Sequence, residues 1–308
     1  MSPSAAGVSL KVASTLSFSV MVVLIKLVSA RVPAGEVLFA RAFFGIIPVL
    51  VYLMWRGEFP GSLHTDNPLG HVRRAVVGTV SMFTWFMGIS YLPLPDATAI
   101  SYSGPLFGVV FAALILREKV RIYRWTAVLV GFVGVMIVLS EQITALEAGL
   151  SGARAIGAAL VLTSAVFAAL AMVTVRELTA SETTGAIVFY FSSSAAVFAL
   201  TTIPFGWLVP RPMDAAIMVL AGLAGGVGQV LMTQAYRLAE ASVVAPFDYA
   251  NMIWIVLFSY LVFGDLPTLT VVIGSLIVIA SGGFVIWRER QLGLLAAKAR
   301  ANEAGTPG

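Results

Sequence analysis

An acid, an amide and a tyrosine interrupt an apolar stretch at residues 245–252, which read APFDYANM. Asp248 and Asn251 stand three residues apart, so a helix presents them on one side, and Tyr249 and Met252 form the adjoining strip. We expect these four residues to bind a polar ligand. Three roles for Asp248 stay open: titration as a proton carrier, binding of a ligand amine, and a structural role in which it pairs with a buried base or satisfies free backbone groups.

A second set of aromatic, hydroxyl and amide side chains is expected to line the same site. It comprises Trp85, Ser101, Tyr102 and Gln229. Polar groups of this kind fix a charged head group, whereas aromatic and methionine walls accept a variable apolar portion. The set therefore favours a small zwitterion with an apolar side chain. A lipid-facing anchor is the alternative role for Trp85.

Two cations, Lys26 and Arg41, also lie inside apolar stretches. Lys26 is about 6 Å of helix from the end of its stretch, so its ammonium can reach water. Arg41 is about 10 Å inside, where a guanidinium needs an anion. Asp96 and Glu36 are candidate partners, and the sequence is compatible with either an outer gate or a static ion pair.

Long apolar stretches hold all of these residues and identify an integral membrane protein. Of the 308 residues, 59% are hydrophobic and 11% are charged, and the mean hydropathy is +0.96, far outside the soluble globular range. A helix of about 17 to 25 apolar residues crosses the hydrocarbon core of a bilayer. The sequence predicts an all-α polytopic protein with ten such helices, at residues 9–30, 34–55, 73–92, 95–116, 124–140, 154–175, 185–206, 213–236, 241–263 and 267–287.

The distribution of basic residues predicts the orientation of these ten helices. With a cytoplasmic amino terminus, 14 of the 19 lysines and arginines fall in cytoplasmic segments, Lys11 and Arg74 among them, three fall outside, and Lys26 and Arg41 lie within spans. The positive-inside rule therefore places both termini in the cytoplasm, as expected for a multi-pass protein of the cell inner membrane. This bias accounts for the basic charge balance, so no nucleic-acid partner is expected.

Prolines and glycines predict where the helices bend and where they touch. Pro105 and Pro246 fall inside predicted spans, where loss of a backbone hydrogen bond bends or opens a helix and lines a cavity. Gly222 and Gly226 have the spacing of small residues at close helix contacts, and so do Gly104 and Gly108. We expect the prolines to mark helix kinks and the two glycine pairs to mark packing surfaces.

The two halves of the chain repeat each other. A shift of 147 residues aligns residues 91–139 with 238–286 without a gap, places Tyr102 on Tyr249 and places Glu118 on Asp265. The predicted units are residues 1–147, residues 148–288 and a cytoplasmic tail at 289–308 that is expected to become disordered. Because each half holds five spans, an odd number, the second half is inverted, and inverted repeats place a substrate site near the midplane where they meet.

These features resemble the drug/metabolite transporter superfamily, specifically its ten-span family of bacterial metabolite exporters. The similarity rests on SYSGPLFGVVFAALILRE ending at Glu118, on VFGD ending at Asp265, on Arg41 in FARAFFG, and on the glycine-rich GFVGV and IASGGF. It covers nearly the whole chain and is greatest with exporters of aromatic and neutral amino acids. The family places Pro105 in its motif, whereas the second half has Met252 at that position.

The resemblance implies a secondary transporter that exports neutral and aromatic amino acids by alternating access, with no enzymatic activity, cofactor or metal. Protons are a candidate coupling ion, and the expected assembly is a monomer or a homodimer. The alternatives are a carrier of another small metabolite or drug, such as a nucleobase, a vitamin or a lipophilic cation, and a channel-like facilitator.

Overall fold

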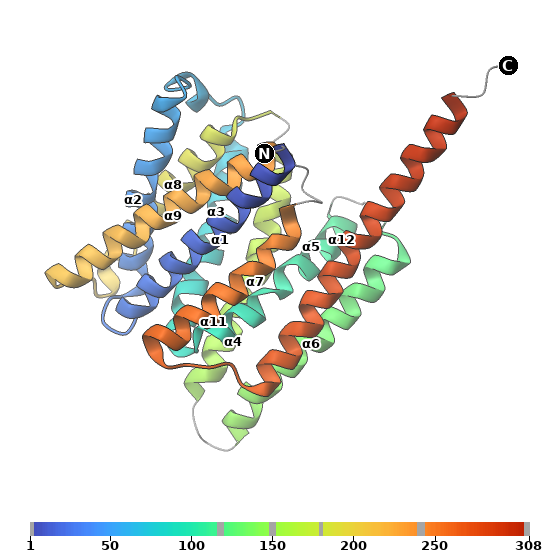
Figure 1. Ribbon diagram of the computed structural model, residues 1–308. Helices are drawn as coiled ribbons and strands as arrows, with labels where there is room; N and C mark the ends of the chain where they lie inside the picture. Colours follow the sequence, from blue (N-terminus) through green and yellow to red (C-terminus); the bar gives the residue numbers. More distant parts are fainter. Residues whose placement is uncertain (1–2, 116–119, 148–151, 179–180, 239–243, 305–308) are drawn as a thin grey trace.

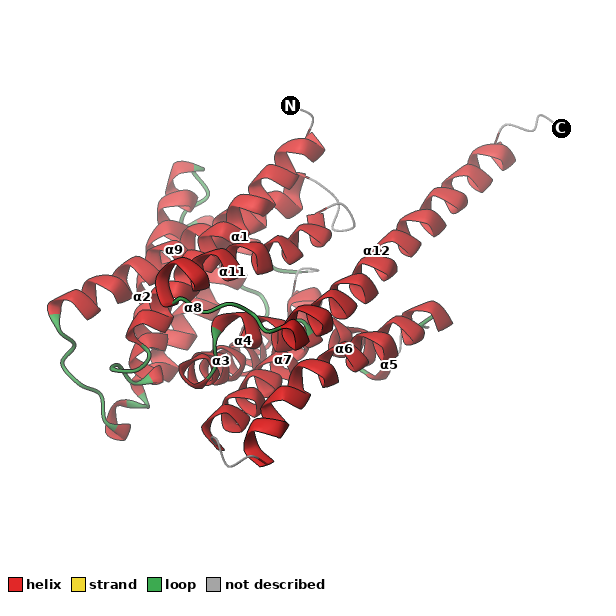
Figure 2. Cartoon of the chain, turned by 60° about the horizontal axis from the view of Figure 1, so that its bottom comes forward, coloured by secondary structure: helices red, strands yellow, loops and turns green. Residues whose placement is uncertain are grey.

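The computed structural model describes residues 3–115, 120–147, 152–178, 181–238 and 244–304, and the regular structure of these ranges is entirely helical (Figures 1 and 2). The helices are α1 (Pro3–Val28), α2 (Ala34–Trp55), α3 (Pro68–Tyr91), α4 (Leu94–Ser101), α5 (Ser103–Leu114), α6 (Ile122–Glu147), α7 (Gly152–Leu178), α8 (Thr184–Leu200), α9 (Pro212–Leu238), α11 (Ala250–Phe263) and α12 (Leu269–Ala304), with short 3-10 turns η1 (Gly61–Leu63), η2 (Ile203–Phe205) and η3 (Ala245–Tyr249).

Each of the ten predicted spans falls on one helix or on a broken pair of helices. α2 has the predicted limits, whereas α1 begins at Pro3 and not at residue 9. Six helices of the described part are long and apolar enough to cross a membrane, and residues 185–200 and 247–263 form shorter apolar helices. The predicted all-α polytopic fold is confirmed. α12 continues into the predicted tail as far as Ala304, and disorder beyond the helix stays a prediction.

Helices of one half pack mainly on helices of the other half. α1, the first helix of the first half, packs against α9, the third helix of the second half. In the same way α7, the first helix of the second half, packs against α3, the third helix of the first half. The contact of α1 with α11 is matched in the same way by that of α7 with α4. The fifth helices of the two halves, α6 and α12, lie side by side (Figure 1). This reciprocal packing is the arrangement of two inverted five-helix repeats.

Small residues allow the closest of these contacts. At Gly222 of α9, an added Cβ would stand 2.6 Å from the Phe44 side chain and 2.9 Å from the Ala40 carbonyl oxygen of α2. At Gly134 of α6, a Cβ would lie 2.7 Å from the backbone oxygen of Gly274 on α12. A side chain at either glycine would force the helices apart, so the packing surface predicted for α9 is confirmed. The surface predicted at Gly104 and Gly108 is not found, because a Cβ at Gly108 would meet no atom of the described residues within 4 Å and one at Gly104 only an ordinary contact at 3.6 Å.

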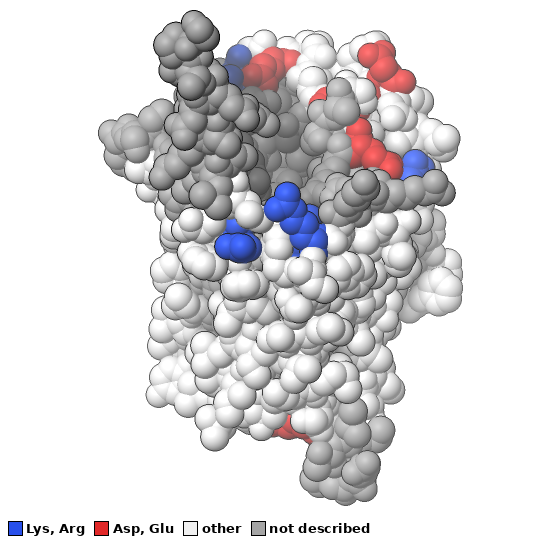
Figure 3. All heavy atoms as spheres, turned by 90° about the vertical axis from the view of Figure 1, so that its right-hand side faces the viewer, with Lys and Arg blue, Asp and Glu red and all other residues white. Residues whose placement is uncertain are grey.

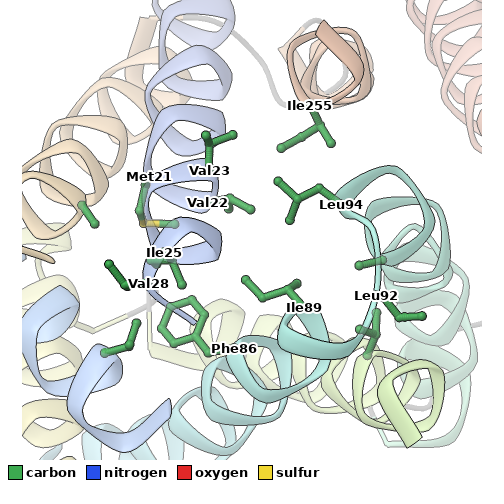
Figure 4. Packing of buried hydrophobic residues seen from close by; sticks show 14 of the residues in the cluster. Met21, Val22, Val23, Ile25, Val28, Phe86, Ile89, Leu92, Leu94 and Ile255 are labelled. Atoms are coloured by element: carbon green, nitrogen blue, oxygen red, sulfur yellow. The ribbon is translucent and has the colours of Figure 1, made fainter. Parts of the chain in front are cut away.

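The largest buried cluster joins α1, α2, α3, α4 and α11. Figure 4 shows Ile25, Phe86, Ile89, Leu94 and Ile255 from four of these helices converging on one interior space. On the outside, apolar side chains are exposed along most of the helices. In Figure 3 the visible acids and bases lie in the upper half of the view and near its lower end, and the broad band between them shows none. Such a band matches the hydrocarbon region of a bilayer.

A polar clamp joins two loops where α3 and α8 begin. Asn67 caps α3 by accepting a hydrogen bond from the Gly70 amide at 2.9 Å. The Glu182 carboxylate accepts from Thr65 Oγ1 at 3.0 Å and from the backbone amides of Asp66 and Asn67. The clamp therefore ties the first half to the second at the predicted cytoplasmic surface.

Candidate functional site

Two broken helices meet inside the bundle, and both breaks fall at a tyrosine. α4 ends at Ser101 and α5 begins at Ser103, so Tyr102 occupies the first break. Pro105 cannot donate to the Ser101 carbonyl, which weakens the helix at this turn. The second break follows η3, which ends at Tyr249. The Tyr102 and Tyr249 rings contact each other edge to face, with centroids 5.3 Å apart and an interplanar angle of 71°.

The repeat therefore brings together the tyrosines that it aligns in sequence. The Tyr249 hydroxyl lies against Gly282 of α12, in the space that a Cβ at this glycine would fill. The Tyr102 hydroxyl lies beside the side chain of Asn251 and the backbone of Met252. Four of the eight predicted binding residues are thus gathered at the junction of α4, α11 and α12. We call this group of Tyr102, Tyr249, Asn251 and Met252 the tyrosine junction.

Asp248 lies next to the tyrosine junction and forms an ion pair with Lys11 of α1. Lys11 Nζ lies 2.6 Å from Asp248 Oδ1, and the lysine side chain is 1% exposed whereas the aspartate side chain is 51% exposed. One α1 residue, Ser19, donates to Asn251 Oδ1 at 2.8 Å. Asp248 and Asn251 therefore both face α1, as their spacing predicted.

Lys11 corrects one assignment made from the sequence. Lys11 was counted among the cytoplasmic charges because it lies close to residue 9, where the first span was predicted to begin. The helix starts at Pro3, so Lys11 stands more than two turns inside it and is buried. Of the three roles open for Asp248, the structure shows pairing with a buried base. The proton-carrier and amine-binding roles stay hypotheses.

Three predicted binding residues are placed elsewhere. The Ser101 hydroxyl donates to the Thr98 carbonyl at 2.7 Å within its own helix. Trp85 is half-buried and packs against the main apolar cluster. Gln229 lines a separate pocket between α2, α8 and α9, together with Thr233. No hydrogen bond, ion pair or ring contact among the described residues joins these three side chains to the tyrosine junction, but Trp85 and Met252 pack against the same apolar cluster.

The second predicted kink differs from the first. Pro246 stands in the opening turn of η3, and its side chain lies outside the described residues. A proline at this position begins a helix and does not bend one, because the first amide groups of a helix have no intrahelical partner. The chain breaks three residues later, after Tyr249.

Cations at the predicted outer end stabilise helix ends. Lys26 donates to the carbonyls of Ile89 and Leu92, the latter at 2.7 Å, and thereby satisfies the carboxyl end of α3. Arg31 Nη2 lies 2.6 Å from Asp214 Oδ1 and joins α1 to the start of α9. This pair was not predicted from the sequence, although the acid in the first turn of α9 was a detectable signal.

The predicted pairing of Arg41 with Asp96 or Glu36 is absent from the contacts of the described residues. Glu36 instead accepts from the Leu208 amide at 3.3 Å, and Asp96 is buried in the first turn of α4. Arg74 was predicted to be a cytoplasmic charge, whereas two of its guanidinium nitrogens are shielded from solvent. Arg41 and Arg74 therefore lie inside the bundle without carboxylate partners among the described residues.

Known proteins match this chain over most of its length. Residues 5–140 and 155–287 each match the EamA-like transporter family. A pseudopaline exporter, CntI of Pseudomonas aeruginosa, is 33% identical over 280 residues, which cover 89% of this chain and 94% of the relative. An S-adenosylmethionine uptake transporter of Rickettsia bellii is 28% identical and covers 90% of this chain and 92% of the relative.

A riboflavin transporter of Vibrio cholerae is 29% identical, over 84% of this chain and 85% of the relative. A solved structure titled "Crystal structure of protein" superposes with a TM-score of 0.61 over 91% of this chain and 98% of its own, at 19% identity, and supports the fold alone.

These names correct the predicted likeness to amino-acid exporters, because the relatives are named for S-adenosylmethionine, pseudopaline and riboflavin. The coarser prediction is confirmed: with two matching segments that fill most of its length, the chain belongs to the EamA-like transporter family of the drug/metabolite transporter superfamily.

Proposed function

We propose that the chain is a secondary carrier of a small polar metabolite and that the metabolite binds at the tyrosine junction. The observation that carries the proposal is the contact of Tyr102 with Tyr249 across two helix breaks that the repeat relates. Irregular backbone within a membrane is tolerated where protein or a water-filled cavity surrounds it. Transporters of inverted-repeat design use such discontinuous helices at their central sites.

The substrate class in this proposal is the alternative that the sequence left open, a small metabolite other than a neutral amino acid. The names of the relatives support this choice. We assign carrier action at the inner membrane without a direction of transport, because relatives named for uptake and for export both match. Export of neutral and aromatic amino acids is the second candidate, favoured by the aromatic wall at Tyr102 and Tyr249.

A transport panel in liposomes tests the substrate class. The purified chain is reconstituted, and uptake of labelled S-adenosylmethionine, riboflavin, a nucleobase, phenylalanine and leucine is measured against protein-free liposomes. Uptake of one of the first three, with little uptake of the two amino acids, is the expected result. Uptake of phenylalanine and leucine alone would reverse the assignment in favour of the second candidate.

The binding site is tested with the solute that the panel selects. Tyr102→Ala removes one half of the aromatic contact, and we expect roughly tenfold lower transport at low solute concentration with normal protein abundance. Met136→Ala on α6 is a suitable control because Met136 is exposed on the outer surface. Parent-like transport by Tyr102→Ala would remove the tyrosine junction from the substrate path.

A further inference from the structure

We propose that Arg41 and Arg74 together form an anion-binding subsite inside the bundle, which takes the carboxylate of the transported metabolite. The assignment deepens the carrier function proposed above and rests on it. It concerns a group of side chains separate from the tyrosine junction. Its evidence is the position of the two guanidinium groups and the lack of partners for them among the described residues.

Arg74 reaches toward the middle of its helix. Its guanidinium lies over Gly78, one turn further into α3, in the space that a Cβ at Gly78 would occupy. The same guanidinium stacks on the Phe191 ring of α8, with Cζ 4.0 Å from the ring centroid. A basic side chain near a membrane surface normally extends toward water. Arg74 does the opposite, and the glycine at position 78 makes this conformation sterically possible.

Arg41 approaches the same region from α2. Its Nε would lie 3.5 Å from a Cβ at Gly225 of α9. The two arginines lie within electrostatic range of each other. Gly78 and Gly225 stand 147 residues apart, which is the shift of the internal repeat. Of these two glycines, Gly78 leaves room for a guanidinium, whereas a Cβ at Gly225 would be in ordinary van der Waals contact with Arg41.

Three nitrogen atoms of this pair have no protein partner in the described part of the chain. Arg41 Nε, Arg74 Nε and Arg74 Nη1 are shielded from solvent and make no hydrogen bond there. Three acids of the described part have other partners: Asp248 pairs with Lys11, Asp214 pairs with Arg31, and Glu36 accepts a hydrogen bond from the Leu208 amide. The described part thus places two positive charges within electrostatic range of each other and forms no ion pair with either of them.

Two positive charges inside the bundle are unfavourable unless an anion binds between them. A guanidinium stays protonated in proteins, so Arg41 and Arg74 cannot lower this electrostatic cost by losing a proton. A buried charge without a partner is strongly destabilising, and two like charges add repulsion. Charged residues at membrane depth that face the protein interior commonly mark a substrate path. The missing anion is therefore assigned to the metabolite.

A carboxylate fits the geometry better than a phosphate. The edge of a guanidinium carries its N–H donors in a fork that matches a carboxylate, and stacking on Phe191 leaves this edge available. Phosphate sites usually add backbone amides from a helix amino terminus. Arg41 and Arg74 stand beyond the first four residues of α2 and α3, where backbone amides are already bonded within the helix.

Anion-dependent thermal unfolding tests the subsite without any transport step. The full-length chain is purified in neutral detergent and unfolded in succinate, inorganic phosphate or chloride at equal ionic strength. Succinate is expected to raise the unfolding midpoint above that in chloride. Arg41→Gln and Arg74→Gln should each weaken the apparent affinity for succinate roughly tenfold or more. A larger effect of phosphate than of succinate, or no effect of either, would overturn the assignment.

Two matched controls separate binding from folding. Arg73→Gln changes the adjacent arginine, which is exposed and pairs with Glu177 at 3.3 Å, and should leave the succinate effect intact. Gly78→Ala keeps both charges but displaces the Arg74 guanidinium, so it should weaken the succinate effect, whereas Gly108→Ala adds a methyl group in open space and should not.

The midpoint without succinate distinguishes a binding role from a structural one. Removal of an uncompensated buried charge should leave the anion-free midpoint of Arg74→Gln unchanged or higher. A lower midpoint together with a parent-like succinate effect would show that the arginines only support the fold. If liposomes carry a neutral solute equally well in the parent and in both variants, the subsite is refuted while the carrier function stands. If no solute is carried, the carrier function fails independently of the succinate result.

Discussion

At the scale of single residues, the pair formed by Lys11 and Asp248 joins a buried charge to a half-exposed one. The ammonium is almost completely buried, and the carboxylate 2.6 Å away is half-exposed. A buried charge depends on its partner much more than an exposed charge does. The pair also joins α1 of the first half to η3 of the second half. We therefore expect it to stabilise the contact between the halves.

A double-mutant cycle measures this coupling. Lys11→Met and Asp248→Asn should each lower the thermal midpoint, and the double variant should lose less than the sum of the two. Because Asp248 is half-exposed, the coupling free energy is expected to be about 1 kcal/mol. Strictly additive losses would show that the contact contributes nothing to stability. Asp248→Asn also tests the proton-carrier hypothesis, because unchanged pH dependence of transport would eliminate that role.

The clamp at Glu182 predicts a dependence of stability on pH. Burial raises the pKa of this carboxyl, but hydrogen bonds from His71, Thr65 and the backbone amides of Asn67 and Asp66 outweigh burial and leave the pKa below its ordinary value of 4.5. A lowered folded-state pKa stabilises the protein above the unfolded pKa, and this stabilisation is lost as the pH falls through the folded value. The parent should therefore be more stable than Glu182→Gln at neutral pH.

The check on this prediction is the difference in unfolding midpoint between the two proteins. The difference should shrink as the pH falls below about 4.5. Glu58→Gln is a control in the same predicted cytoplasmic region, because Glu58 pairs with Arg56 at 3.2 Å near the surface and has no part in the clamp. A difference that stays constant from pH 7 to pH 3.5 would contradict the role given to the clamp.

At the scale of helices, hydropathy predicted where the spans lie but not which of them touch. The limits of α2 follow directly from its apolar composition, and Pro105 signalled the break at Tyr102. Helix contacts inside a membrane depend on how small residues fit together, and hydropathy does not report this fit. From the sequence, Gly282 and Gly283 were only part of a glycine-rich segment. In the structure the Tyr249 hydroxyl lies against Gly282 and not against Gly283.

The same limit applies to the candidate site. Asp248, Tyr249, Asn251 and Met252 are close in sequence, so a single helical segment predicted their grouping. Arg74 was placed in the cytoplasm because sequence counts it by distance from a span end. Its inward direction depends on space at Gly78 and on the ring of Phe191, which belongs to a helix more than 100 residues away. No local pattern contains that information.

Neighbouring glycines of α12 provide a sharp test of the tyrosine junction. Gly282→Ala places a methyl group where the Tyr249 hydroxyl lies, whereas a methyl group at Gly283 meets open space. Gly282→Ala should displace Tyr249 and lower transport several-fold, and Gly283→Ala should behave like the parent. The two rates are compared in the same liposome preparation. Equal rates would show that the contact of Tyr249 with α12 has no part in transport.

At the scale of the whole molecule, the halves of the sequence are not separate bodies. α1 packs on α9 and α3 packs on α7, so helices of both halves belong to each packed region. The division into residues 1–147 and 148–288 describes the repeat and stays a prediction as a division into domains. In the carrier proposed above, movement between inward-open and outward-open states would therefore separate mixed groups of helices. The breaks at Tyr102 and Tyr249 lie at an interface between the repeats.

Single cysteines test the predicted orientation, and the parent chain contains none of its own. Asp66→Cys lies in an exposed loop on the predicted cytoplasmic side, and Val209→Cys lies in an exposed loop on the opposite side. A membrane-impermeant maleimide added to intact cells should label the second variant and not the first. Inverted vesicles should give the reverse pattern. Labelling of Asp66→Cys in intact cells would contradict cytoplasmic termini.

Counterflow is the most direct test of the central claim that the chain is a carrier which exposes one site to each side in turn. Liposomes that contain the parent chain are loaded with unlabelled solute from the panel, and uptake of the same labelled solute is compared with uptake into empty liposomes. A carrier predicts faster, saturable uptake into loaded liposomes, with a transient overshoot of label. Uptake that rises linearly with concentration and is unaffected by internal solute would identify a channel-like facilitator and contradict the account.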